Sequence, residues 1–140
     1  MIRKLLIHSE QEMKNLAEEL FNRYSKGAII TLNGNLGAGK TFLVKAFCHA
    51  AGVPLSSSPT FAIVNSYDGK IKIYHFDFYR IKKSDELHDI GIEEYLLDES
   101  AVSFIEWANL FPEVLPKKRV DIMINVLNDE IREVIIESHE

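Results

Sequence analysis

Residues 34–41 read GNLGAGKT, and this stretch decides the fold that we expect. Its G-x-x-x-x-G-K-T spacing is the P-loop pattern, whose glycines let the backbone curl so that successive N–H groups point at phosphate oxygens. The context supports the motif, because a β-branched apolar run at residues 28–32 precedes it and a helical apolar pattern at residues 39–51 follows it. A glycine-rich turn with a chance lysine is the alternative, and the flanking strand and helix disfavour it.

The P-loop pattern gives each of its residues an expected role. Backbone N–H groups and the positive end of the following helix would bind the phosphates. Lys40 would contact the β- and γ-phosphates, and the Thr41 hydroxyl would ligate Mg²⁺. The expected nucleotide-binding residues of this segment are Leu36, Gly37, Ala38, Gly39, Lys40 and Thr41.

An acidic residue follows a second apolar run. Residues 101–105 are expected to form a buried strand that ends at Glu106. Because α/β sheets bind ligands at the carboxyl ends of their parallel strands, Glu106 is predicted to be the metal-side carboxylate of the site. An ordinary surface acid at the end of a strand is the alternative.

Two further candidates lie between the P-loop and Glu106. Asp77, within HFDFYR at residues 75–80, could orient the attacking water or help to hold Mg²⁺, and a turn that pairs Asp77 with Arg80 fits equally well. Thr60 lies in a loop where switch threonines sense the γ-phosphate, although its spacing alone favours a turn or capping role. The histidines, His75 among them, show no metal-ligand spacing and are assigned no chemistry.

The remaining pattern predicts one α/β domain over residues 1–140. The expected architecture is a three-layer sandwich like that of P-loop NTPases, with a mixed sheet that has a parallel core and antiparallel hairpins. A helix is expected to start at Ser9, with Ser9 and Glu12 as a capping box. Ser84 is expected to cap another helix, which runs to about residue 97 with an interruption at Gly91. The expected additional strands are residues 2–7, 61–67, 71–77, 120–127 and 131–137.

Composition narrows the function. The chain has 21 acidic residues against 16 Lys plus Arg, so tight binding of tRNA by the protein alone is not expected. A single cysteine, no signal-peptide core and no apolar stretch of membrane-spanning length predict a cytoplasmic protein with no membrane association. The absence of an N-K-x-D motif favours ATP over GTP, and the lack of a clustered arginine lid favours an ATPase over a kinase.

Four stretches together resemble the bacterial TsaE (YjeE) family of ATPases, which act in tRNA threonylcarbamoyladenosine biosynthesis. They are residues 34–41, residues 58–61 (SPTF), residues 75–80 (HFDFYR) and residues 105–107 (IEW). The first stretch is generic, whereas the other three are specific to the family at these spacings. Phe78 stands where the family usually has an aliphatic residue, and the neighbouring motif positions are intact.

The resemblance implies a biological role that the residues alone do not. Members of the family work with the TsaD and TsaB proteins, which place threonylcarbamoyl on the adenosine beside the anticodon of certain tRNAs. TsaD carries the transfer chemistry, and ATP hydrolysis by TsaE resets the TsaB–TsaD assembly between turnovers. On this reading the chain meets tRNA only indirectly, through the complex.

The resemblance also implies residue roles. Thr41 and Glu106 would hold Mg²⁺, Asp77 would take part in hydrolysis beside Lys40, and Thr60 would be a switch residue. Adenine would rest between the N-terminal segment near Glu10 and a basic residue of the final hairpin, a position that Arg132 matches. Two other readings stay open: a small-molecule phosphotransferase of the P-loop class, and a scaffold that binds ATP with very little turnover.

Overall fold

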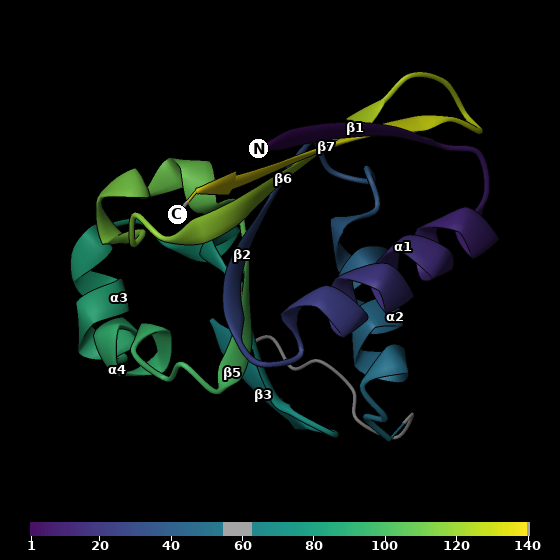
Figure 1. The fold of residues 1–140 in the computed structure, drawn as a ribbon. Helices are drawn as coiled ribbons and strands as arrows, with labels where there is room; N and C mark the ends of the chain where they lie inside the picture. The colour runs from purple at the N-terminus through teal and green to yellow at the C-terminus, as the bar shows by residue number, and fades with distance from the viewer. Residues whose placement is uncertain (55–62, 140) are drawn as a thin grey trace.

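The computed structural model describes residues 1–54 and 63–139, and strands and helices alternate along most of the chain (Figure 1). The predicted strand–loop–helix around the P-loop is present as β2 followed by α2. The strands are β1 (Ile2–Ile7), β2 (Ala28–Asn33), β3 (Val64–Asp68), β4 (Lys72–Asp77), β5 (Ala101–Glu106), β6 (Arg119–Val126) and β7 (Arg132–His139). The helices are α1 (Glu10–Tyr24), α2 (Lys40–Ala50), α3 (Ser84–Asp89) and α4 (Ile92–Leu96), with 3₁₀ turns η1 (Phe78–Arg80), η2 (Ala108–Leu110) and η3 (Pro112–Val114).

The strands form one seven-stranded mixed sheet in the order β1-β7-β6-β2-β5-β4-β3. Its centre is parallel, because β2 pairs in parallel with both β5 and β6, and β4 pairs in parallel with β5. Antiparallel pairs flank this centre: the β3–β4 and β6–β7 hairpins, and β1 on β7. The predicted fold class is therefore confirmed, and the carboxyl ends of β2, β4 and β5 meet at one edge of the sheet.

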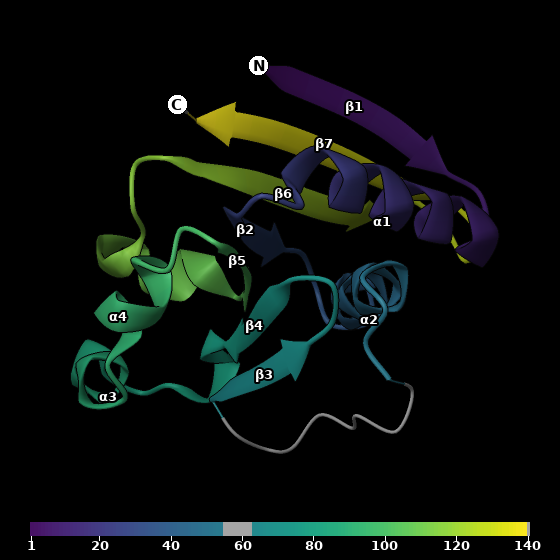
Figure 2. The same ribbon diagram turned by 60° about the horizontal axis from the view of Figure 1, so that its bottom comes forward.

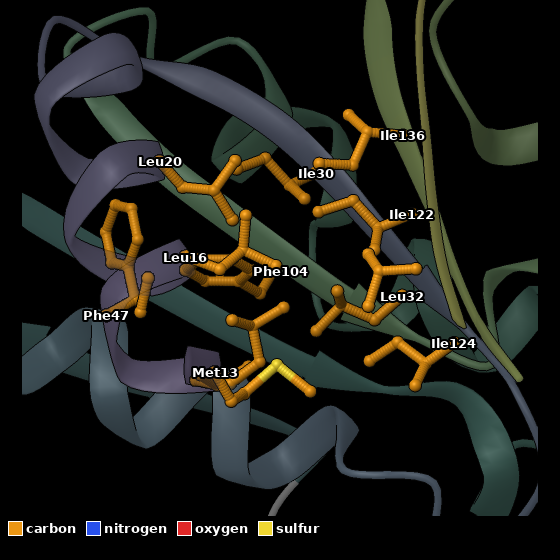
Figure 3. Packing of buried hydrophobic residues seen from close by; sticks show 14 of the residues in the cluster. Met13, Leu16, Leu20, Ile30, Leu32, Phe47, Phe104, Ile122, Ile124 and Ile136 are labelled. Atoms are coloured by element: carbon orange, nitrogen blue, oxygen red, sulfur yellow. The ribbon is translucent and has the colours of Figure 1, made fainter. Parts of the chain in front are cut away.

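Helices cover both faces of the sheet. Helices α1 and α2 lie on one face, and α3 and α4 lie on the other over β4 and β5 (Figures 1 and 2). On the first face, Met13, Leu16 and Leu20 of α1 meet Phe47 of α2 and Phe104 of β5 (Figure 3). The rings of Phe47 and Phe104 are 4.8 Å apart in an edge-to-face arrangement, which fixes α2, and with it the P-loop, against β5.

The helix starts differ from the predicted capping in two details. Ser9 is the N-cap of α1 and accepts a hydrogen bond from the Glu12 amide at 3.1 Å, but the Glu12 carboxylate accepts from the His8 amide rather than from Ser9. The prediction that Ser84 caps its helix is wrong, since Lys83 occupies the N-cap and Ser84 is the first helical residue. The interruption predicted at Gly91 is present: φ of 76° at this residue separates α3 from α4.

Candidate functional site

The P-loop backbone turns in a way that requires glycine. Gly34 has φ of 149°, and a Cβ atom at this position would lie 2.5 Å from the carbonyl oxygen of Ile124 in β6. Gly39 has φ of 112° and is the N-cap of α2, so the helix begins at Lys40 without a side-chain cap. The loop therefore leaves the first amides of α2 without a capping side chain, the arrangement by which a helix start binds anions.

The Lys40 side chain lies within the P-loop, where it is predicted to contact the phosphates. The residue is 5% exposed, and its ammonium group donates to the carbonyl of Gly34 and lies 3.7 Å from the centroid of the Trp107 ring. Burial lowers the pKa of Lys40, and the negative charges of Glu106 and Asp77 act in the opposite direction. Both predicted carboxylates therefore raise the pKa of the P-loop lysine.

Thr41 and Glu106 face each other across the gap between α2 and β5. The Thr41 hydroxyl lies 3.2 Å from each carboxylate oxygen of Glu106, and the Glu106 residue is 5% exposed. On its other side Glu106 meets His75 of β4, whose Nε2 is 2.5 Å from Oε2. The structure thus places the two residues predicted to hold a metal side by side, at the carboxyl end of a central strand.

Asp77 lies beside Glu106 in the sheet. The register of the parallel β4–β5 pair sets Asp77 opposite Glu106, at the last position of each strand. The Asp77 carboxylate also accepts a hydrogen bond from the Tyr79 amide at 3.0 Å and so caps the 3₁₀ turn η1. Asp77 therefore combines a structural role in this turn with a place at the candidate site. Thr60, the predicted switch residue, lies outside the described residues.

A pocket of about 630 Å³ adjoins the P-loop, and Glu106 is not among the residues that line it. The β1–α1 connection, the P-loop and the β6–β7 turn form its walls, and Glu10 and Arg132 are both part of them. The antiparallel pairing of Ile7 with Arg132 brings these two regions together. Leu36 is 70% exposed at the tip of the loop. The complete lining is Ile7, His8, Ser9, Glu10, Met13, Gly37, Ala38, Gly39, Phe42, Asp129, Glu130 and Arg132.

The donor atoms around Thr41 fit magnesium in kind. A hydroxyl and carboxylates are hard oxygen donors, which Mg²⁺ prefers, and Mg²⁺ bound with a nucleotide takes one or two protein ligands besides phosphate and water. Within residues 1–54 and 63–139, no group of three or more His, Cys, Asp or Glu is arranged to hold a metal ion. A metal at this site would therefore depend on Thr41, Glu106 and the phosphates together.

Two contacts at the site involve His75 and Trp107, for which no chemical role was predicted from the sequence. His75 lies two positions before Asp77 in β4, so the two side chains share the sheet face that carries Glu106. Trp107 directly follows Glu106 and adopts φ of 60°, which turns its ring over Lys40. The alternation within β4 could have indicated His75, since every second residue from Asp77 backwards faces α2.

Comparison with known proteins places the chain among close relatives. The family model described as threonylcarbamoyl adenosine biosynthesis protein TsaE matches residues 7–134. The tRNA threonylcarbamoyladenosine biosynthesis protein TsaE of Bacillus subtilis (strain 168) is 39% identical over 126 residues, which cover 89% of this chain and 78% of that protein. The protein of the same name from Rickettsia bellii is 33% identical over 132 residues, covering 91% and 89%.

A solved structure shares the whole fold. The crystal structure of YdiB from Bacillus subtilis superposes with a TM-score of 0.84 at 31% sequence identity, and the match covers 100% of this chain and 87% of that one. Among the helices of the described ranges, none has the length and apolar character needed to cross a membrane.

Proposed function

This chain belongs to the TsaE family of threonylcarbamoyl adenosine biosynthesis proteins, and we propose that it binds and hydrolyses Mg·ATP in association with TsaB and TsaD. Membership of the family gives it a role in tRNA threonylcarbamoyladenosine biosynthesis and implies nucleotide binding. The contact between Thr41 and Glu106 carries the proposal for ATP hydrolysis, because it joins the P-loop to an acidic strand end.

The residues divide the work of hydrolysis in the following way. P-loop amides and Lys40 would hold the phosphates. The Thr41 hydroxyl would offer an oxygen lone pair to the metal while its proton bonds Glu106. When bound, Mg²⁺ neutralises charge that develops on the phosphate oxygens. Glu106 and Asp77, adjacent at the strand ends, are the two candidates to orient the attacking water.

The nucleoside is proposed to occupy the pocket beside the P-loop. Glu10 and Arg132 line this pocket together with Gly37 and Gly39, so a nucleotide whose phosphates lie in the loop has its base within reach of both side chains. Arg132 suits this place because a guanidinium plane stacks on aromatic rings and donates hydrogen bonds. The pocket volume of about 630 Å³ is in the range of small-molecule sites.

The surface of this chain is proposed to contact protein partners directly, rather than RNA. The formal net charge is −5, and a protein that binds tRNA by itself needs a basic surface to displace counterions from the phosphates. We therefore expect ATP-dependent association with TsaB–TsaD, and contact with tRNA only through that complex. Sedimentation at physiological salt tests this, since tight, salt-sensitive binding of the isolated chain to tRNA would contradict it.

The deciding experiment is an ATPase assay of the chain alone, with TsaB, with TsaD and with both. A rate that rises when both partners are present supports the proposed function. A rate that rises instead with a small hydroxylated acceptor, together with a phosphorylated product, would favour a phosphotransferase. Saturable ATP binding with no partner-stimulated hydrolysis would favour a nucleotide-dependent scaffold.

A further inference from the structure

The Glu106 carboxylate is a buried group with hydrogen-bonding partners on two sides. The side chains of His75 and Glu106 are only 9% and 6% exposed, and Nε2 of His75 lies 2.5 Å from Oε2 of Glu106. An ionised carboxylate can only accept hydrogen bonds, so in the ionised form that a metal would need, the imidazole nitrogen would be the donor in this contact. Taking such a charge out of water is costly unless it is hydrogen-bonded, and Thr41 and His75 both meet this need.

The two partners constrain the carboxylate differently. The Thr41 hydroxyl is equidistant from the two oxygens, at 3.2 Å from each, and therefore does not select one rotation of the carboxylate over another. The terminal torsion of a glutamate side chain is broad and roughly two-fold, so it has little preference of its own. His75 contacts Oε2 alone, so it distinguishes the two oxygens and fixes the rotation of the carboxylate, while Oε1 keeps only its contact with the Thr41 hydroxyl.

We propose that His75 is a positioning residue for Mg·ATP: it holds the Glu106 carboxylate in the one rotation that serves the metal and the Thr41 hydroxyl. The proposal rests on the proposed function and deepens it by assigning the residue that orients its acidic group. His75 does not touch the nucleotide in this role and acts through Glu106 alone.

The backbone around His75 suits a positioning role. His75 lies in β4, which pairs in parallel with β5 along six residues, so the ladder fixes the distance between the His75 and Glu106 backbones. Both neighbours of His75 in the strand, Tyr74 and Phe76, pack on the opposite face of the sheet with Ile105. The imidazole is therefore held on a rigid element, as a residue that orients a metal ligand needs to be.

A matched control exists on the far side of the molecule. His88 also pairs with a glutamate, Glu93, but both side chains are more than half exposed, at 53% and 55%. This exposed His–Glu pair joins α3 to α4 and lies outside the P-loop, the pocket and the strand ends. Replacing His88 by alanine removes the same chemical contact without touching the candidate site.

The test is calorimetry on the full chain and measures the gain in ATP affinity that Mg²⁺ provides. This Mg²⁺ gain is the Kd for ATP in EDTA divided by the Kd for ATP in saturating Mg²⁺. Losing a residue that orients a metal ligand typically lowers metal affinity or activity by about 10- to 100-fold. We expect His75→Ala to reduce the Mg²⁺ gain by about tenfold or more and to leave the Kd for ATP in EDTA unchanged. The control variant His88→Ala should behave as the wild type in both conditions.

Two conservative variants separate positioning from packing. The amide nitrogen of glutamine reaches about as far from the backbone as Nε2 of histidine, whereas that of asparagine reaches only as far as Nδ1. His75→Gln should therefore keep most of the Mg²⁺ gain and His75→Asn should lose it. If His75→Ala proves unfolded in a thermal melt, the comparison of these two variants decides the question, and equal gains for both would overturn the proposal.

A double-mutant cycle tests whether His75 acts through Glu106. In a Glu106→Gln background, His75→Ala should cause no further loss of the Mg²⁺ gain, because the group that it positions has already changed. Losses that add would overturn the proposal, as would a full gain in His75→Ala alone. A wild-type chain with no Mg²⁺ gain would instead contradict the Mg·ATP site itself, so the two failures are distinguishable.

Discussion

The ammonium group of Lys40 lies 3.7 Å from the centroid of the Trp107 ring, so the P-loop lysine forms a cation–π pair with the only tryptophan of the chain. Among the described residues, Trp107 is the one non-glycine residue with positive φ, a conformation that costs on the order of 1–3 kcal/mol. The Trp107 amide donates to the carbonyl of Leu32 at 3.2 Å, and the Tyr79 ring lies 5.0 Å away. The ring is thus held over the lysine from several sides.

This pair predicts that ATP changes the fluorescence of Trp107. The ammonium of Lys40 faces the ring and the carbonyl of Gly34, and it must turn away from them to bind phosphate oxygens. Titration of intrinsic fluorescence with ATP measures the effect, and Lys40→Ala serves as the control that should not respond. Saturable ATP binding by calorimetry with constant Trp107 fluorescence would show that the pair does not rearrange.

Alanine substitutions of Lys40 and Thr41 are expected to weaken ATP binding in different ways. Lys40→Ala removes a charge that acts on the phosphates and should weaken ATP binding with and without Mg²⁺. Thr41→Ala removes a hydroxyl that acts through the metal, so the affinity in EDTA should be largely spared. ATP titrations in both conditions measure this, with Thr41→Ser as the variant that keeps the hydroxyl. Equal affinity losses for Thr41→Ala in both conditions would count against the metal role.

The sequence predicted the structure best where an element depends only on residues that are neighbours in the chain. The P-loop and the strand that ends at Glu106 are each contiguous, so glycine spacing and apolar runs were sufficient to predict them. The contact between His75 and Glu106 is different, because it exists only when β4 lies next to β5, and the strand order is a property of the whole sheet. Metal-ligand spacing could not indicate a histidine that contacts a carboxylate 31 residues away.

The pocket beside the P-loop shows the same limit. Glu10 and Arg132 are far apart in the sequence, and only the family resemblance indicated that they belong together. In the structure the pairing of β1 with β7 sets Ile7 opposite Arg132 and so brings the two walls together. No periodicity in either segment predicts that an N-terminal strand pairs with the last strand of the chain.

Cys48 is expected to resist alkylation while the protein is folded. Burial raises the pKa of this thiol from 9.0 to about 11, and only the thiolate is nucleophilic. At pH 8 the thiolate fraction should therefore be about a hundredfold lower than in the unfolded chain. The same shift should lower the free energy of unfolding as the pH rises from about 9 to about 11, because the unfolded chain then loses the proton that the folded chain keeps.

Iodoacetamide labelling followed by mass spectrometry, in buffer and in urea, measures the protection of Cys48. Rapid labelling in buffer at the rate found in urea would contradict the burial of this thiol. A chemical denaturation series between pH 8 and pH 11 measures the accompanying loss of stability.

Arg132→Ala is expected to weaken the binding of ATP and ADP without weakening that of inorganic triphosphate. The side chain lines the pocket next to the P-loop rather than the loop itself, so its contribution should depend on the nucleoside. A guanidinium that stacks on a base contributes about 0.5–2 kcal/mol, which is roughly a 2- to 30-fold change in Kd. Competition titrations with the three ligands measure it, and Arg23→Ala, at the far end of α1, is the matched control. An equal loss for inorganic triphosphate would place Arg132 at the phosphates instead.

Glu106→Gln is expected to reduce hydrolysis far more than ATP binding at saturating Mg²⁺. The amide keeps the shape of the buried side chain between Thr41 and His75 but removes the charge that orients metal and water. Electrostatic preorganisation of this kind contributes about 10²–10³ in rate. The assay compares ATP hydrolysis by wild type and variant with TsaB and TsaD present, and Asp77→Asn is measured beside them because Asp77 is the other carboxylate at the strand ends. If Glu106→Gln hydrolyses ATP at the wild-type rate while Asp77→Asn does not, Asp77 orients the attacking water, and Glu106 has a structural role rather than a role in the reaction.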